Sequence, residues 1–265
     1  MAFSVGDIDE SQAPLLDHLI ELRTRLLRCV FALAIGFAIS LYFADEIFGF
    51  LVRPLTAAFP AGEGKLIYTQ LYEAFFVELK VALFSAFFLA FPVIANQLWA
   101  FVAPGLYAKE KKAFLPFLLA TPVLFSAGAA LAYYVVMPTA FKFFLTFEGQ
   151  KGGLQLEALP GTSNYLGLVM QFILAFGISF LLPVLMLLLN RAGIVSRAQL
   201  IAARRYVIVG MAIFAAIVTP PDVVSQLMLL IPLMLLFEGA LVVMWFIDRN
   251  VAEAGAEEAT DEIPA

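Results

Sequence analysis

The chain has 265 residues, of which 63% are hydrophobic and 14% are charged, and its net charge is −5. Soluble domains are nearer half apolar and a quarter charged, so the composition excludes an ordinary soluble protein and predicts an integral membrane protein. One cysteine and one histidine cannot build an internal disulfide or a tetrahedral metal site, so no metal or other cofactor is expected.

Residues 1–28 are predicted to form a cytoplasmic segment with no removable secretory signal, because they contain no apolar core followed by a small-residue cleavage site. Leucines at helical spacing predict an amphipathic helix along the inner membrane surface. These leucines are Leu15, Leu19, Leu22 and Leu26. The simplest role of Glu21 is an i, i+4 ion pair with Arg25, while the neighbouring arginines bind lipid headgroups. His18 by itself is most simply an interfacial histidine.

Six apolar stretches are candidates to cross the hydrocarbon core, which takes about 20 residues. They are Cys29–Phe48, Phe75–Phe101, Phe114–Met137, Tyr165–Leu189, Tyr206–Val218 and Val223–Ile247. Eleven of the 16 basic residues fall on one side of these spans, so the positive-inside rule predicts both termini in the cytoplasm. We therefore expect one all-α membrane domain, 1–265, with six transmembrane helices over 29–247 and a disordered cytoplasmic tail over 248–265.

Two predicted outer loops, roughly 49–72 and 138–164, are rich in glycine and proline and are expected to cap the outer face with short helices and turns. The fifth stretch has 13 residues between Arg205 and Thr219, which make about 20 Å of helix. This length predicts local thinning of the membrane, with snorkelling of Arg204 and Arg205 as the alternative.

A second carboxylate, Glu110, lies among three lysines in the predicted inner loop "AFVAPGLYAKEKKAF", Ala100 to Phe114. Read plainly, this is a basic loop with an aromatic belt. However, Glu21 and Glu110 are both isolated acids in basic segments of one membrane face. Two such carboxylates suit an arginine-bearing ligand, because a guanidinium binds carboxylates through charge-assisted and often bidentate hydrogen bonds.

Two acidic residues near the last span have simple structural roles. Asp222, in the turn "VTPPDVVSQ", is expected to cap the following helix by accepting from its free N–H groups. Glu238 lies inside an apolar run, where an ionisable group needs a partner or water.

Four segments carry a resemblance that covers nearly the whole chain in order. They are "HLIELRTRL", "ANQLWAFVAPGLYAKEKK", "AFGISFLLPV" and "VTPPDVVSQ". Together they resemble the TatC family of twin-arginine translocase subunits. The resemblance implies a receptor and core subunit of the cell inner membrane, which is not an enzyme and has no nucleic-acid partner. Such a subunit binds twin-arginine signal peptides and, in homo- or hetero-oligomers with single-span TatA and TatB, moves folded proteins using the proton motive force.

The resemblance also implies site residues. For signal-peptide binding they are Glu21, Arg23, Phe101 and Glu110, with both carboxylates facing the twin arginines. For structure and the docking of partner helices they are Pro54, Pro92, Tyr133, Thr219, Asp222, Gln226 and Glu238. The chain departs from the family at Leu181, where a Glu or Gln is usual. Gln171 lies ten residues earlier, about 15 Å along a helix, and is a poor substitute.

Three other classes of membrane protein compete with this interpretation. A secondary transporter needs ionisable or unwound sites in paired repeats, and the sequence contains neither. An intramembrane hydrolase needs a buried dyad, whereas His18 lies outside the spans and Asp222 has no second aspartate at its depth. A scaffold without a peptide site shares the same fold and differs only at Glu21 and Glu110.

Overall fold

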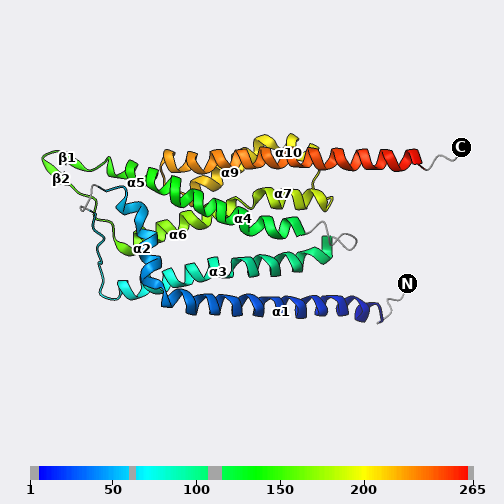
Figure 1. Ribbon diagram of the computed structural model, residues 1–265, viewed down its shortest axis with the longest axis horizontal. Helices are drawn as coiled ribbons and strands as arrows, with labels where there is room; N and C mark the ends of the chain where they lie inside the picture. Colours follow the sequence, from blue (N-terminus) through cyan, green and yellow to red (C-terminus); the bar gives the residue numbers. More distant parts are fainter. Residues whose placement is uncertain (1–5, 60–63, 107–114, 262–265) are drawn as a thin grey trace. The chain divides into compact units, whose positions relative to one another are not determined.

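The computed structural model describes residues 6–59, 64–106 and 115–261, and most of them are helical (Figure 1). The helices are α1 (Gly6–Tyr42), α2 (Ala44–Thr56), α3 (Glu73–Leu106), α4 (Leu115–Leu131), the π-helical segment η2 (Ala132–Val136), α5 (Met137–Leu145), α6 (Thr162–Ser179), α7 (Leu182–Arg191), α8 (Arg197–Ala202), α9 (Arg204–Val218) and α10 (Val223–Asp261). Strands β1 (Gly149–Lys151) and β2 (Leu154–Leu156) form an antiparallel hairpin.

The chain groups into two compact units. The first unit comprises Met1–Val52, Ile67–Pro122 and Gly161–Leu166, and the second comprises Arg53–Leu66, Val123–Pro160 and Gly167–Ala265. The single membrane domain that the sequence suggests stays a prediction.

Five helical stretches are long and apolar enough to cross a membrane, and they match five of the six predicted spans. They are His18–Tyr42, Glu73–Phe101, Phe117–Leu145, Thr162–Arg191 and Val223–Arg249. The predicted fifth span lies in α9, which has 15 residues and a length of about 22 Å. The helical membrane architecture is thus confirmed, and a sixth span at α9 stays a prediction.

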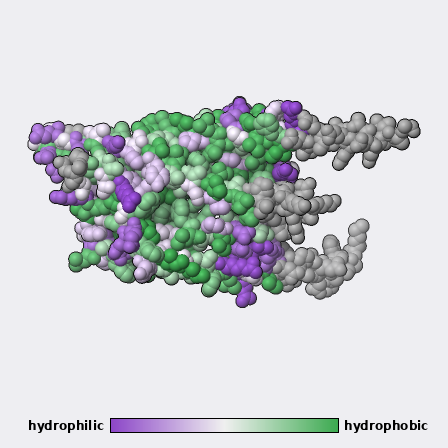
Figure 2. All heavy atoms as spheres, in the orientation of Figure 1, coloured by the Kyte–Doolittle hydropathy of each residue, from purple (hydrophilic) through white to green (hydrophobic). Residues whose placement is uncertain are grey.

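The surface of the helices suits lipid rather than water. Large apolar side chains such as Phe31 and Ile217 are 69% and 72% exposed. Figure 2 shows hydrophobic side chains along the middle of the helices and hydrophilic ones gathered toward their ends. A soluble protein rarely exposes such extensive apolar surface, whereas a membrane protein presents it to the hydrocarbon core.

Helix α1 differs from its prediction at both ends. It runs without a break from Gly6 to Tyr42, so the predicted surface helix and the first span form one helix. No glycine or proline interrupts residues 15–35, which explains the continuity. The chain then turns at Phe43, and α2 leaves the line of α1 (Figure 1). The predicted end of the first span at Phe48 was therefore wrong, because apolar residues continue past the turn.

In the first unit, α1 packs along α3 through small residues. A Cβ atom added to Gly36 would lie 3.0 Å from the carbonyl oxygen of Ala86. On α3, Ala82, Ala86 and Ala90 recur every fourth residue and are at most 2% exposed. Small side chains at this spacing let two helix backbones approach closely, which favours association in a membrane.

Glu73, the first residue of α3, joins two segments of the first unit. Its Oε2 accepts hydrogen bonds from the backbone N–H (2.8 Å) and the hydroxyl (3.1 Å) of Thr69, and its Oε1 accepts one from the backbone N–H of Ser163 (2.9 Å). Beside it, the N–H and hydroxyl of Thr162 both donate to the carbonyl of Ile67, at 2.9 and 3.1 Å. The loop before α3 is thereby held against the start of α6.

In the second unit, α4 and α6 cross at two glycines. A Cβ atom on Gly128 would lie 2.4 Å from the carbonyl oxygen of Phe176, and one on Gly177 would lie 2.7 Å from the ring of Phe125. Directly after this crossing, the α-helix becomes the π-helical segment η2, in which Ala132, Tyr133 and Val136 are buried. The crossing therefore requires glycine at these two positions.

Helix α10 is the longest element of the second unit and packs against α7, α8 and α9. The Nε of Arg197, in the first turn of α8, donates to the carbonyl of Leu241 at 3.2 Å. Helix α10 continues to Asp261, over residues for which the sequence suggests disorder. Alanine and glutamate are frequent there, and both favour helix, which accounts for the difference.

The two predicted cap loops contain the second half of α2 and the β1–β2 hairpin, and the strands of the hairpin were not predicted. Gly152 and Gly153 join the strands with φ of +61° and +84°. Positive φ at both central residues defines the tight turn that matches the twist of a hairpin, and glycine adopts it without steric cost.

We predict that Gly128→Ala lowers the free energy of unfolding by about 1–3 kcal/mol, because the added methyl group forces α4 away from α6. Thermal unfolding of the purified protein in detergent measures the effect. The matched control is Gly167→Ala on α6, where no atom lies within 4 Å of the added Cβ. A Gly128→Ala protein as stable as this control would show that the crossing is not tight.

Candidate functional site

The first half of α1 meets the last described turns of α3 in the first unit. The imidazole of His18 stacks on the ring of Phe101, with centroids 4.3 Å apart and an angle of 17° between the planes. The Nδ1 of His18 also lies 3.8 Å from Oε2 of Glu21. His18, expected to be only an interfacial histidine, thus links two predicted site residues, Glu21 and Phe101.

The carboxylate of Glu21 is partly occupied. Arg25 donates to its Oε1 through Nε at 2.9 Å and also through Nη2, which confirms the predicted i, i+4 pair. Among the described residues, Oε2 accepts no hydrogen bond, because the contact with His18 is longer than a hydrogen bond. The carboxylate therefore retains an acceptor for another cationic donor.

The other two predicted residues of this site are not joined to Glu21. Arg23 is exposed and forms no ion pair within the described part of the chain. It lies two residues from Glu21, so the two side chains do not share a helix face. Glu110 falls in 107–114 and lies outside the described residues. The pairing of Glu21 with Glu110 stays a prediction.

An apolar groove of about 350 Å³ runs along α1 and α3 beside Phe101. It is lined by Leu22, Arg25, Leu26, Cys29, Val30, Leu33, Ile94, Gln97, Leu98 and Phe101. At its edge, Nη1 of Arg28 donates to Oε1 of Gln97 at 3.5 Å. Sequence reasoning did not single out Gln97, although a polar side chain near the end of an apolar span was a usable signal.

The turn between α9 and α10 is built as predicted. Oδ1 of Asp222 accepts from the N–H of Ser225 at 2.7 Å, which confirms the helix cap. Thr219 is buried and its hydroxyl donates to the carbonyl of Ala215 at 2.8 Å. Nε2 of Gln226 donates to the carbonyl of Ala212 at 3.4 Å, a long hydrogen bond. Thr219 therefore closes the last turn of α9, and Gln226 joins α10 to α9.

Two polar side chains in the spans of the second unit have partners. Oε2 of Glu238 lies 2.8 Å from Nη2 of Arg204, so the acid in the apolar run has the partner it was expected to need.

Leu181 lies at the break between α6 and α7, where it is the N-cap of α7. Nε2 of Gln171 donates to the carbonyl of Val218 at 2.9 Å and so holds the end of α9.

The remaining predicted positions occupy separate elements. Pro54 is buried in α2 and Tyr133 is buried in η2, both in the second unit. Pro92 is exposed on α3 in the first unit. Pro54 and Tyr133 are thus part of the packed interior of the second unit, and a docking or structural role for the three residues stays a prediction.

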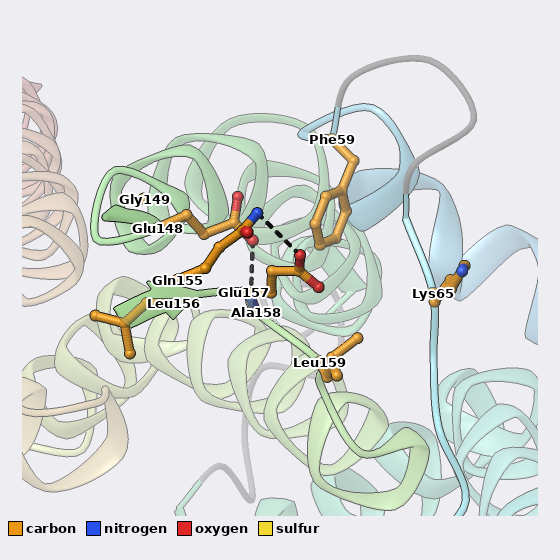
Figure 3. Close-up of a pocket in the computed structure, with 9 residues that line it drawn as sticks. All are labelled: Phe59, Lys65, Glu148, Gly149, Gln155, Leu156, Glu157, Ala158 and Leu159. Atoms are coloured by element: carbon orange, nitrogen blue, oxygen red, sulfur yellow. Dashed lines mark hydrogen bonds between the residues drawn. The ribbon is translucent and has the colours of Figure 1, made fainter. Parts of the chain in front are cut away.

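A second pocket, of about 670 Å³, lies between the hairpin and Phe59 in the second unit (Figure 3). Oε1 of Glu148 accepts from the N–H of Ala158 at 2.8 Å, and Oε1 of Glu157 accepts from Nε2 of Gln155 at 3.2 Å (Figure 3). Lys65 points away from both carboxylates. Among the residues that the structure describes, no group of three or more His, Cys, Asp or Glu could hold a metal.

Comparison with known proteins identifies one family throughout. A family model described as Sec-independent protein translocase protein (TatC) matches residues 17–232. The Sec-independent protein translocase protein TatC of Magnetococcus marinus is 49% identical over 249 residues, 94% of this chain and 90% of the relative. The TatC protein of Escherichia coli K12 is 40% identical over 229 residues, 86% of this chain and 87% of the relative.

A solved structure shows the same fold. It is a crystal structure of the twin arginine translocase receptor TatC in the detergent DDM, with a TM-score of 0.74 and 38% sequence identity. The match covers 85% of this chain and 98% of that one.

We predict that Glu238→Gln lowers the free energy of unfolding by about 1 kcal/mol, because it leaves the Arg204 guanidinium without its charged partner. The same substitution in an Arg204→Gln background should cost clearly less, since no ion pair remains to be lost. Unfolding of the wild type, the two single variants and the double variant in detergent gives the coupling free energy between Glu238 and Arg204. Equal effects in both backgrounds would show that the pair contributes nothing.

Proposed function

The chain belongs to the TatC family of Sec-independent protein translocases, and on this basis we propose that it is the receptor and core subunit of a twin-arginine translocase. It is a membrane protein and a component of a protein translocase. In our proposal it binds twin-arginine signal peptides and, with single-span TatA and TatB, moves folded proteins across the membrane using the proton motive force. It carries out no catalysis of its own.

The observation that carries the receptor role is the position of Glu21. Its Oε2 lies 3.8 Å from Nδ1 of His18, whose ring stacks on Phe101, and this oxygen accepts no hydrogen bond among the described residues. An arginine of the peptide would donate to this Oε2, or would replace Arg25 at Oε1. A guanidinium also stacks well on planar rings, so the His18–Phe101 pair offers it a second contact.

The basic surroundings of Glu21 favour selectivity. Arg23, Arg25 and Arg28 repel any cationic ligand, so a single lysine or a small cation, which makes few hydrogen bonds, gains little. A peptide with two adjacent arginines makes several charge-assisted hydrogen bonds, each contributing about 1.5–3 kcal/mol. We propose that Glu110 supplies the second carboxylate, so that two acids receive two arginines.

The finer topology is also part of the proposal. We place six spans in the inner membrane in one domain, with α9 as the fifth span and both termini in the cytoplasm. The distribution of basic residues supports this orientation. Because α9 has only 15 residues, the membrane beside it would be thin.

The turn between α9 and α10 is the proposed docking site for TatA and TatB. Oδ2 of Asp222 and Oγ of Ser225 are buried and have no hydrogen-bond partner among the described residues. An unpaired buried polar atom is costly, so a polar side chain of a partner helix would be favoured there. The long bond of Gln226 is the one most easily exchanged for a bond to the partner.

We predict different effects for two substitutions in α1. Glu21→Gln should weaken binding of a twin-arginine signal peptide at least about tenfold, because one charge-assisted hydrogen bond or more is lost. Arg25→Gln should preserve or tighten binding, since it removes the competitor for Oε1. Photocrosslinking or titration of a labelled peptide measures both.

The matched control for these variants is Glu46→Gln, an exposed acid of α2. Changing both Glu21 and Glu110 to alanine should abolish peptide binding. Undiminished binding by that double variant would contradict the receptor role.

We predict that changing Thr219 and Gln226 together to leucine weakens co-purification of a single-span partner several-fold. The substitution removes polar groups that a partner helix could bind, and it frees the turn from α9. Signal-peptide binding is the control and should persist. Unchanged recovery of the partner would leave both residues with a purely structural role.

A further inference from the structure

A second site in the first unit is centred on Lys80, a lysine within the apolar span of α3. Lys80 lies seven residues after Glu73, about 10 Å along α3. Its side chain is exposed, and its one described hydrogen bond is a long one of 3.4 Å to the hydroxyl of Ser163. No carboxylate within the described residues forms an ion pair with it. A charged side chain at this depth is costly and is retained where it binds something.

Glu73 supplies a fixed negative charge on the same side of α3. A spacing of seven residues is nearly two full turns, so Glu73 and Lys80 share one helix face. The bonds from Thr69 and Ser163 hold the carboxylate in place. Its Oε1 accepts only one of them, and a carboxylate oxygen can accept two. One acceptor therefore remains for a further donor.

A cavity of about 410 Å³ lies over these two residues. It is lined by Thr69, Gln70, Tyr72, Glu73, Phe76, Lys80, Gly161, Ser163 and Asn164. The rings of Tyr72 and Phe76 form an edge-to-face pair beside the charges. Aromatic side chains of this kind concentrate at the level of lipid headgroups.

We propose that this cavity binds the headgroup of a zwitterionic phospholipid that carries a primary ammonium group. In a membrane the phosphate of such a lipid lies nearer the hydrocarbon than the ammonium does. Lys80, the deeper residue, would bind the phosphate, with the hydroxyl of Ser163 as a second donor. Glu73, at the start of the helix, would accept from the ammonium. The order of the two protein charges along α3 thus matches the order of the two lipid charges.

The occupant follows from the charges in the cavity. An anionic lipid without an ammonium group would leave the carboxylate of Glu73 unmatched beside its own negative charge. A lipid with a trimethylated ammonium could not donate a hydrogen bond to that carboxylate. The apolar side chain of Leu83, exposed one turn below Lys80, offers a path for an acyl chain.

Native mass spectrometry of the full-length protein in detergent tests the proposal. Phosphatidylethanolamine, phosphatidylcholine and phosphatidylglycerol are added separately at equal concentration. The wild type should retain one phosphatidylethanolamine about tenfold better than Lys80→Gln, which lacks the charge-assisted bond to the phosphate. Lys80→Arg should retain it, and Lys142→Gln, an exposed lysine of α5, should behave as wild type.

Three results would overturn the proposal. Equal retention by the wild type and Lys80→Gln would show that Lys80 does not bind the lipid. Equal retention of phosphatidylglycerol and phosphatidylethanolamine would show that Glu73 does not bind an ammonium. Added inorganic phosphate should not displace the lipid, and displacement would indicate a simple anion site instead. Lys80→Gln should still bind the twin-arginine peptide at Glu21, so the result is independent of the proposed receptor function.

Discussion

Close approach of helix backbones is the constraint on which this structure depends. In hydrocarbon, helices gain no hydrophobic attraction for one another, so their association relies on packing and on a few polar bonds. Gly36 against Ala86 in the first unit, and Gly128 against Phe176 in the second, are two points of close backbone approach. A side chain at either glycine would separate the helices that present the polar groups of that unit.

Several polar bonds among the described residues lie near helix ends. Glu73 joins the loop before α3 to the start of α6, while Glu21 and His18 lie near the other end of the α1–α3 pair. In the second unit, Glu238 pairs with Arg204 and Asp222 caps α10. Apolar side chains are accommodated equally well by lipid and by other helices. The polar bonds therefore determine which helix ends lie together. They also leave specific acceptors, such as Oε2 of Glu21, available to ligands.

The sequence predicts the helices and the simple polar pairs well, because both depend on residues close in the chain. Hydropathy locates five spans, and helical spacing predicts the Glu21–Arg25 pair. Contacts over long distances in the chain were not predictable in this way. The stacking of His18 on Phe101 and the bond from Gln171 to Val218 depend on tertiary packing. The turn at Phe43 was missed because apolarity does not change there. The hairpin was missed although Gly152-Gly153 is a known turn signal.

The π-helical segment Ala132–Val136 gives the third span two different packing faces. A π turn holds one residue more than an α turn, so the helix after it is rotated by about 100° relative to an uninterrupted helix. Phe125 before the segment and Phe141 after it are both buried, although their spacing would place them about 160° apart around an uninterrupted α-helix. Deleting a single residue of the segment would restore a regular helix and turn one of these two rings toward the lipid. In this span the number of residues in the π-helical segment, more than their identity, therefore sets which side chains after the segment face the interior.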